Sequence, residues 1–129
     1  MKTVKGSFQV KSSPLENDST TQEIGAMRMK FDKTFLGPLS ATSIVSMMGI
    51  MDRNTGSGAY VAIEKIIGEL ENKKGSFCMT HSSSMNQGVP QQSITVIPGT
   101  GTDELKNISG NMIIDIVDGN HFYTFQYQI

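Results

Sequence analysis

Hydrophobic and polar residues alternate along most of the chain, in segments separated by short runs rich in Gly, Pro, Asn and Asp. A period of two residues is typical of β-strands that bury one face. The pattern predicts eight strands, at about Thr3–Lys11, Ala26–Phe35, Leu39–Met51, Tyr60–Glu71, Gly75–Met85, Gln91–Ile97, Asn111–Val117 and His121–Gln128. Long strands joined by tight turns favour an antiparallel up-and-down barrel, which leaves no sheet edge exposed. We therefore expect one all-β domain over residues 1–129, an eight-stranded barrel.

Three segments do not follow the strand pattern simply. Ile63–Leu70 also has helical spacing, but the preceding Tyr60-Val61 and the following turn residues favour a strand. Ser12–Gln22 is polar and contains a proline, which predicts an exposed loop. Asp103–Asn107 is short enough to form a single helical turn.

The two faces of the predicted strands differ less than in a simple barrel. The inward positions are aromatic and rich in Met, while Gly6, Ala62 and Gly68 leave room among them. Apolar residues also occupy outward positions, namely Val61, Ile63, Ile67, Ile113, Val117 and Phe122. Strands that are apolar on both faces are usually covered on both. We therefore expect a homo-oligomer, either a dimer or a trimer, that buries part of the barrel wall.

Ionisable residues on the apolar inward faces are the strongest candidates for chemistry. They are Lys33, Glu64 and His81. If Asn72-Lys73 is a two-residue turn, Glu64 lies opposite His81, and a four-residue loop would make them diagonal neighbours on the same face. A buried carboxylate must be paired or protonated, and a Glu–His pair satisfies this need. The same pair can also move a proton or orient a ligand, so a structural cross-strand ion pair and a functional site both stay open.

Composition and charge exclude several classes of protein. The 129 residues carry a net charge of -1, which argues against a nucleic-acid-binding protein. No apolar run approaches the roughly 18 residues of a membrane helix, and the N-terminus lacks the apolar stretch of a secretion signal. A cytoplasmic protein with no membrane partner is therefore expected.

Other candidate motifs are weak. Gly99–Glu104 is rich in glycine but lacks the Gly-Lys-Ser/Thr ending of a phosphate-binding loop. Cys78, the single cysteine, points away from the inner face and cannot form an intramolecular disulfide. A zinc site at Glu64 would need further well-placed ligands, so no metal and no cofactor is predicted.

Several segments resemble a family of small uncharacterised bacterial proteins, a domain of unknown function whose fold is similar to that of allene oxide cyclase. The resemblance covers nearly the whole chain. It is carried by the segments Lys5–Val10, Phe31–Gly37, Gly58–Glu64, Gly75–His81, Gly101–Gly110 and Ile114–Tyr123. It implies an eight-stranded antiparallel barrel that binds apolar or aromatic molecules in its interior. In the plant cyclase, a trimer, a polar group meets the epoxide oxygen of the substrate, and Glu64 is the residue here that could take a carboxylate's part.

Three functions are compatible with the sequence. The first is binding of a small apolar or aromatic molecule in the barrel interior, oriented by Glu64 and His81. The residues expected to contact it are Phe8, Met29, Phe31, Lys33, Tyr60, Met79, Tyr123 and Phe125. The second is an isomerase or cyclase in which Glu64 and His81 act as a catalytic acid–base pair. The third is a non-catalytic structural protein whose barrel only presents an oligomeric surface.

Overall fold

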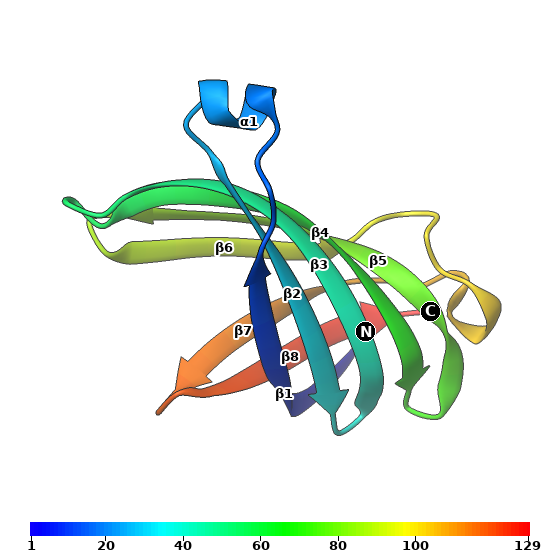
Figure 1. The fold of residues 1–129 in the computed structure, drawn as a ribbon. Coiled ribbons are helices and arrows are strands. Elements are labelled where there is room, and N and C mark those ends of the chain that lie inside the picture. Colours follow the sequence, from blue (N-terminus) through cyan, green and yellow to red (C-terminus); the bar gives the residue numbers. More distant parts are fainter.

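The structure is a computed structural model that describes residues 1–129 and contains eight long strands (Figure 1). The strands are β1 (Lys2–Pro14), β2 (Met27–Leu36), β3 (Leu39–Asp52), β4 (Ser57–Leu70), β5 (Lys73–Asn86), β6 (Val89–Val96), β7 (Ser109–Val117) and β8 (Asn120–Gln128). Each strand pairs antiparallel with its neighbour in sequence, and β8 returns to β1. The predicted closed, antiparallel eight-stranded barrel is therefore confirmed.

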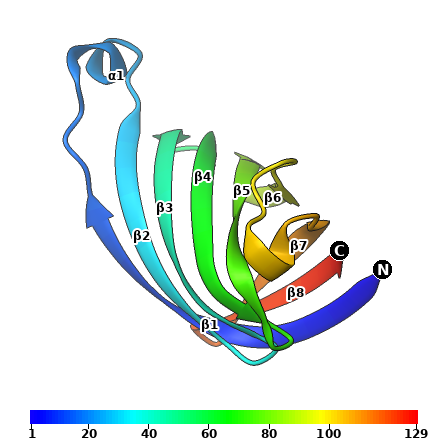
Figure 2. The ribbon, with the colours of Figure 1, turned by 90° about the vertical axis from the view of Figure 1, so that its right-hand side faces the viewer.

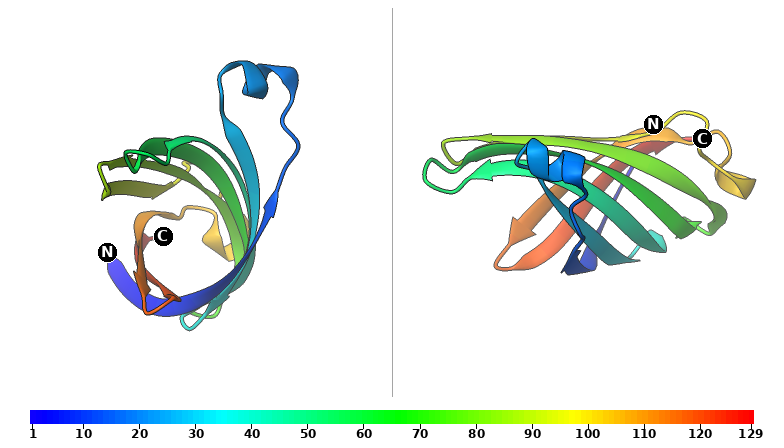
Figure 3. Two further views of the ribbon diagram at one scale, coloured as in Figure 1. Left: turned by 60° about the vertical axis from the view of Figure 1, so that its left-hand side comes forward. Right: turned by 45° about the horizontal axis from the view of Figure 1, so that its top comes forward.

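The barrel is closed unevenly around its circumference. β4 and β5 pair along thirteen residues each, whereas β6 and β7 are joined only by Ile94 with Met112 and Thr95 with Asn111. Beyond this short seam the ends of β3–β6 diverge from the β7–β8 hairpin (Figures 1 and 3). The result is a barrel with one tightly closed end and one wide mouth.

The closed end holds the hydrophobic core. Seventeen buried residues form one cluster, which includes Leu105 and Ile108 from the connection between β6 and β7. The Tyr123 hydroxyl accepts a hydrogen bond from the Leu39 N–H at 3.0 Å and donates one to the Leu36 carbonyl at 2.9 Å. The space left by Gly6 accommodates this hydroxyl, since a Cβ there would lie 2.4 Å from it. A strand glycine thus allows an aromatic side chain to fix the β2–β3 turn.

Two-residue turns set the register of the hairpins. Glu71-Asn72 joins β4 to β5 and Asp118-Gly119 joins β7 to β8, and all four residues have positive φ, as type I′ turns require. The Asp118-Gly119 turn places Ile116 opposite His121. The β4–β5 turn is neither of the two alternatives expected, a two-residue turn at Asn72-Lys73 or a four-residue loop, because the left-handed pair is Glu71-Asn72.

The segment between β1 and β2 differs most from the sequence prediction. β1 extends to Pro14, and a short helix, α1 (Ser19–Glu23), follows where an exposed loop was expected. Asp18 caps this helix by accepting a hydrogen bond from the Thr21 N–H, and Thr21 itself is buried. Figure 2 shows α1 at the mouth, at the opposite end of the barrel from the two termini.

The remaining ambiguous segments follow the prediction. Ile63–Leu70 lies within β4 and is not helical, and a single 3₁₀ turn, η1, occupies Asp103–Leu105. No helix has the length and apolar character needed to cross a membrane. The outward apolar side chains predicted from the pattern are exposed, including Val61, Ile63 and Ile67.

Candidate functional site

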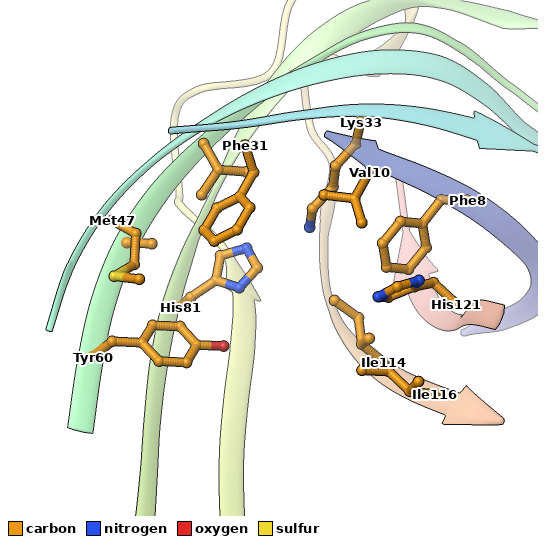
Figure 4. Close-up of a pocket in the computed structure, with 12 residues that line it drawn as sticks. Phe8, Val10, Phe31, Lys33, Met47, Tyr60, His81, Ile114, Ile116 and His121 are labelled. Carbon is orange, nitrogen blue, oxygen red and sulfur yellow. The ribbon is translucent and has the colours of Figure 1, made fainter. Parts of the chain in front are cut away.

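A cavity of about 250 Å³ opens at the mouth of the barrel. Nine of its twelve lining residues are hydrophobic. The lining consists of Phe8, Val10, Phe31, Lys33, Val45, Met47, Tyr60, Ala62, His81, Ile114, Ile116 and His121. Figure 4 shows the polar ends of Lys33, Tyr60, His81 and His121 directed toward its interior. The cavity is therefore an apolar chamber with a small number of polar groups.

Glu64 lies behind the cavity wall and joins three other side chains. It is completely buried, and its Oε1 lies 2.6 Å from His81 Nε2 and 3.4 Å from Lys33 Nζ. Its second oxygen, Oε2, accepts a hydrogen bond from the Ser43 hydroxyl at 2.5 Å. Every oxygen of this carboxylate therefore has a partner, as a buried charge requires.

Strand alternation brings these side chains together from four strands. Lys33 on β2 pairs with Ser43 on β3, and Glu64 on β4 is one step along the same inner face. His81 on β5 pairs with Ala62, which makes it a diagonal neighbour of Glu64. The turn at Glu71-Asn72 therefore keeps Glu64 and His81 on the shared face that was expected, as diagonal neighbours and not directly opposite.

Glu64 is held as a carboxylate. Burial on its own raises the pKa of Glu64, but the His81 hydrogen bond, the positive charge of Lys33 and the Ser43 hydrogen bond outweigh burial. The net result is a pKa below the ordinary value. A carboxylate only accepts hydrogen bonds, so His81 Nε2 must carry the hydrogen that it shares with Glu64.

The tautomer of His81 determines what it presents to the cavity. With the hydrogen on Nε2, the other ring nitrogen, Nδ1, is an acceptor in the neutral imidazole. Nδ1 has no hydrogen-bond partner, and it is not among the buried unsatisfied atoms, so it is accessible from the cavity that His81 lines. Glu64 thus orients a proton acceptor toward the space where a ligand would bind.

Lys33 supplies a positive charge at the same wall. Its amino group lies 5.0 Å from the centre of the Phe8 ring and 5.8 Å from that of Phe35, which are favourable cation–π distances. Its one hydrogen bond is the 3.4 Å contact to Glu64, although an ammonium has three donors. Lys33 therefore retains donors for a ligand.

The structure divides the eight residues expected to contact a ligand into two groups. Phe8, Phe31, Lys33 and Tyr60 line the cavity. The other four, Met29, Met79, Tyr123 and Phe125, do not. Three of these fill the core, because they lie on the inner face but toward the closed end, and Met29 is half-buried outside the lining. Alternation predicts the face of a residue, not its depth along the barrel.

Two polar residues of the site were missed by sequence reasoning. His121 lines the cavity and packs on the Phe8 ring at 5.2 Å between centroids. His121 has the same parity on β8 as the buried Tyr123 and Phe125, and this alternation could have identified it. Ser43 shares the inner parity of Leu39, Ala41 and Val45 on β3, whose alternation could also have identified it. No three His, Cys, Asp or Glu side chains are grouped so that they could hold a metal ion.

Comparison with known proteins gives a family. A model for a protein of unknown function, DUF3224, matches residues 4–127. The chain belongs to the DUF3224 family. The DUF3224 barrel is similar to a solved structure of a DUF3224 protein with unknown function from Shewanella oneidensis MR-1, determined at 1.84 Å resolution. The two share 39% sequence identity with a TM-score of 0.91, over 100% of this chain and 98% of the other.

The family expected from the sequence is thus confirmed. No curated protein matches the chain. The descriptions of DUF3224 and of the Shewanella protein name no activity and no ligand. The functional conclusion therefore depends on the geometry of the site.

Proposed function

We propose that this DUF3224 protein binds a small apolar or aromatic molecule in the mouth of its barrel. The observation that supports this function is the cavity of about 250 Å³ with nine hydrophobic lining residues, Lys33 and His81 at its wall. Ligand sites typically combine an apolar lining with a few placed polar groups. Pockets for drug-sized ligands have volumes of roughly 300–1,000 Å³, so this smaller cavity suits a molecule of one or two rings.

The proposal is tested by obstructing the cavity. Ile116 lines the mouth and is 64% exposed, so Ile116→Trp adds bulk there without disturbing the core. Ile113→Trp is the matched control, because Ile113 is also exposed but is absent from the cavity lining. Binding is measured by fluorescence titration with prodan, a neutral two-ring dye that brightens in apolar surroundings.

We expect prodan to bind the wild type and Ile113→Trp alike, and Ile116→Trp at least tenfold more weakly. Equal binding by both variants would place the dye outside the cavity and contradict the proposal. Absence of binding to all three proteins would contradict it as well, since a two-ring neutral aromatic is the class that the cavity suits.

An acid–base isomerase or cyclase is the second candidate. The hydrogen bond between Glu64 and His81 favours it, because this pair is a common arrangement for moving a proton. Glu64→Gln discriminates the two functions: plain binding tolerates the loss of the carboxylate, whereas turnover of a substrate requires it. A purely structural role, the third alternative, predicts no ligand at all. A cytoplasmic location also stays a prediction.

A further inference from the structure

We propose that the cavity selects ligands with an acidic hydroxyl on an sp² carbon, a phenol or an enol, whose proton is accepted by His81 Nδ1. This inference rests on the proposed binding function and specifies its ligand class. It follows from the arrangement of one acceptor and one cation at the same apolar wall. An alcohol is too weak an acid to use that arrangement fully, and a plain hydrocarbon cannot use it.

His81 is the proton acceptor. Glu64 fixes its tautomer through the 2.6 Å contact at Nε2, so the lone pair of Nδ1 is available to the cavity. A carboxylate behind an imidazole also stabilises the imidazolium that forms when Nδ1 takes a proton. The burial of both groups makes this support stronger than it would be in water, because the local dielectric is low.

Lys33 stabilises the oxygen that loses the proton. Its amino group and the His81 ring bind the same oxygen atom of Glu64, so both lie close to one point of the cavity wall. The ammonium therefore places a positive charge on the wall that holds His81, and this charge attracts a ligand oxygen that becomes negative. Figure 4 shows the Lys33 amino end and the His81 ring on neighbouring parts of the wall.

The charges balance in this complex. Before transfer, in the form with a neutral imidazole at His81, the Lys33 ammonium offsets the Glu64 carboxylate and the ligand carries no charge. During transfer the ligand O–H bond breaks, its electron pair stays on oxygen, and a new N–H bond forms at Nδ1. The resulting imidazolium and oxyanion form a second opposite pair, so no uncompensated charge is created in the apolar cavity.

The aromatic walls favour a flat ligand. Phe8, Phe31 and Tyr60 contribute ring surfaces to the lining. The other titratable groups that face the cavity are the Tyr60 hydroxyl and the His121 ring. Neither of these groups contacts a carboxylate, so neither has the partner that orients His81. A planar phenol or enol therefore fits both the shape and the polarity of the site.

The test compares 4-nitrophenol with 4-nitroanisole, its methyl ether. The two have almost the same shape and apolar area, but only the phenol can transfer a proton, and its phenolate has a separate visible absorption band. Binding of each is measured by isothermal titration calorimetry. The ionisation of bound 4-nitrophenol is followed by absorbance as a function of pH, with the wild-type protein alone.

We expect the phenol to bind at least tenfold more tightly than the ether. We also expect the pKa of bound 4-nitrophenol to fall by about one unit or more, since a tenfold preference for the ionised pair corresponds to one unit. Because the absorbance measurement uses the wild type, it decides the proposal even if a site variant fails to fold.

Three variants assign the roles of the residues. His81→Asn removes the base and Glu64→Gln removes the carboxylate that stabilises the imidazolium, so each should abolish the preference for the phenol while 4-nitroanisole still binds. Lys33→Met should raise the pKa of the bound phenol. The matched controls introduce the same residue types at positions outside the cavity lining, Thr80→Asn, Glu69→Gln and Lys65→Met.

The outcomes separate the two proposals. Equal binding of the phenol and the ether, with an unchanged phenol pKa, would overturn the proton-accepting site and leave cavity binding intact. Loss of both ligands in the wild type would overturn the binding function together with this inference. Loss of the phenol preference in a control variant would show that the preference does not come from His81, Glu64 and Lys33.

Discussion

A buried carboxylate with three partners is the residue-scale feature on which the site depends. Glu64 has no exposed surface, and its contacts to Lys33, Ser43 and His81 use both of its oxygens. Such a cluster contributes little to net stability when compared with an apolar core. It is costly, however, to remove one member and leave the opposite charge buried. The cluster is therefore easier to explain by binding chemistry than by stability.

The pH dependence of stability follows from the lowered pKa of Glu64. Glu64→Gln leaves the Lys33 ammonium buried without a counter-ion, so we expect it to lower the free energy of unfolding by about 3 kcal/mol at neutral pH. The pKa of Glu64 is lower in the folded protein than in the unfolded chain, where it is about 4. The ionised carboxylate therefore stabilises the fold at a pH above the unfolded-state pKa, and this stabilisation is lost as the pH falls through the folded-state pKa. The difference in free energy of unfolding between the wild type and Glu64→Gln should therefore become smaller in acid.

Urea unfolding across a pH series measures this gap. Glu69→Gln is the control, because Glu69 makes only an exposed ion pair with Lys74. The double variant Lys33→Met with Glu64→Gln should recover part of the lost stability. A gap that stays constant down to strongly acidic pH would show that the charge of Glu64 is not the source of the stabilisation.

At the scale of elements, the alternation of residues predicted all eight strands and the pairing order. The same alternation placed Lys33, Glu64 and His81 on one face, because ionisable residues stand out among apolar neighbours. Depth along the barrel was not predictable in this way, which is why Met79, Tyr123 and Phe125 were expected at the ligand and lie in the core. α1 was also missed, since the burial of Thr21 depends on tertiary contacts of a polar segment.

The seam between β6 and β7 is the weakest junction of the barrel. Beside its two residue pairs, a side chain takes the place of a backbone partner: Gln92 Oε1 accepts a hydrogen bond from the Ile114 N–H at 2.8 Å. Gln92→Ala removes this acceptor, and a hydrogen bond is worth about 1 kcal/mol. We therefore expect the Ile114 amide to exchange with solvent deuterium roughly fivefold faster in the variant.

Hydrogen–deuterium exchange read by NMR tests this prediction, with Gln91→Ala as the control. Gln91 is adjacent but makes no side-chain hydrogen bond across the seam. Amides at the β4–β5 junction should be unaffected in both variants, because that pairing is continuous. Equal exchange of Ile114 in the two variants would show that Gln92 does not close the barrel.

At the scale of the whole molecule, the outer wall has a pattern suited to self-association. Ile44 pairs with Lys65, so it lies diagonal to Ile63 and Ile67, and these three isoleucines are all more than half exposed. On the other side, Ile44 pairs with Asp32. An acidic, an apolar and a basic side chain thus form one row across β2, β3 and β4. We propose that this surface pairs with its copy in a second protein molecule.

A two-fold axis through Ile44 makes the row complementary to itself, because Asp32 of one copy then meets Lys65 of the other.

Size-exclusion chromatography with light scattering should give twice the chain mass of 14.1 kDa, and Ile63→Asp should give the monomer. Asp32→Lys alone should also give the monomer, because the new lysine of one copy would then face Lys65 of the other and the two basic side chains would repel each other. The exchange Asp32→Lys with Lys65→Asp should restore the dimer, since it reverses both ends of the row. A monomeric wild type, or a double variant no more associated than the single one, would exclude this interface and leave the mouth of the barrel as the surface through which the protein acts.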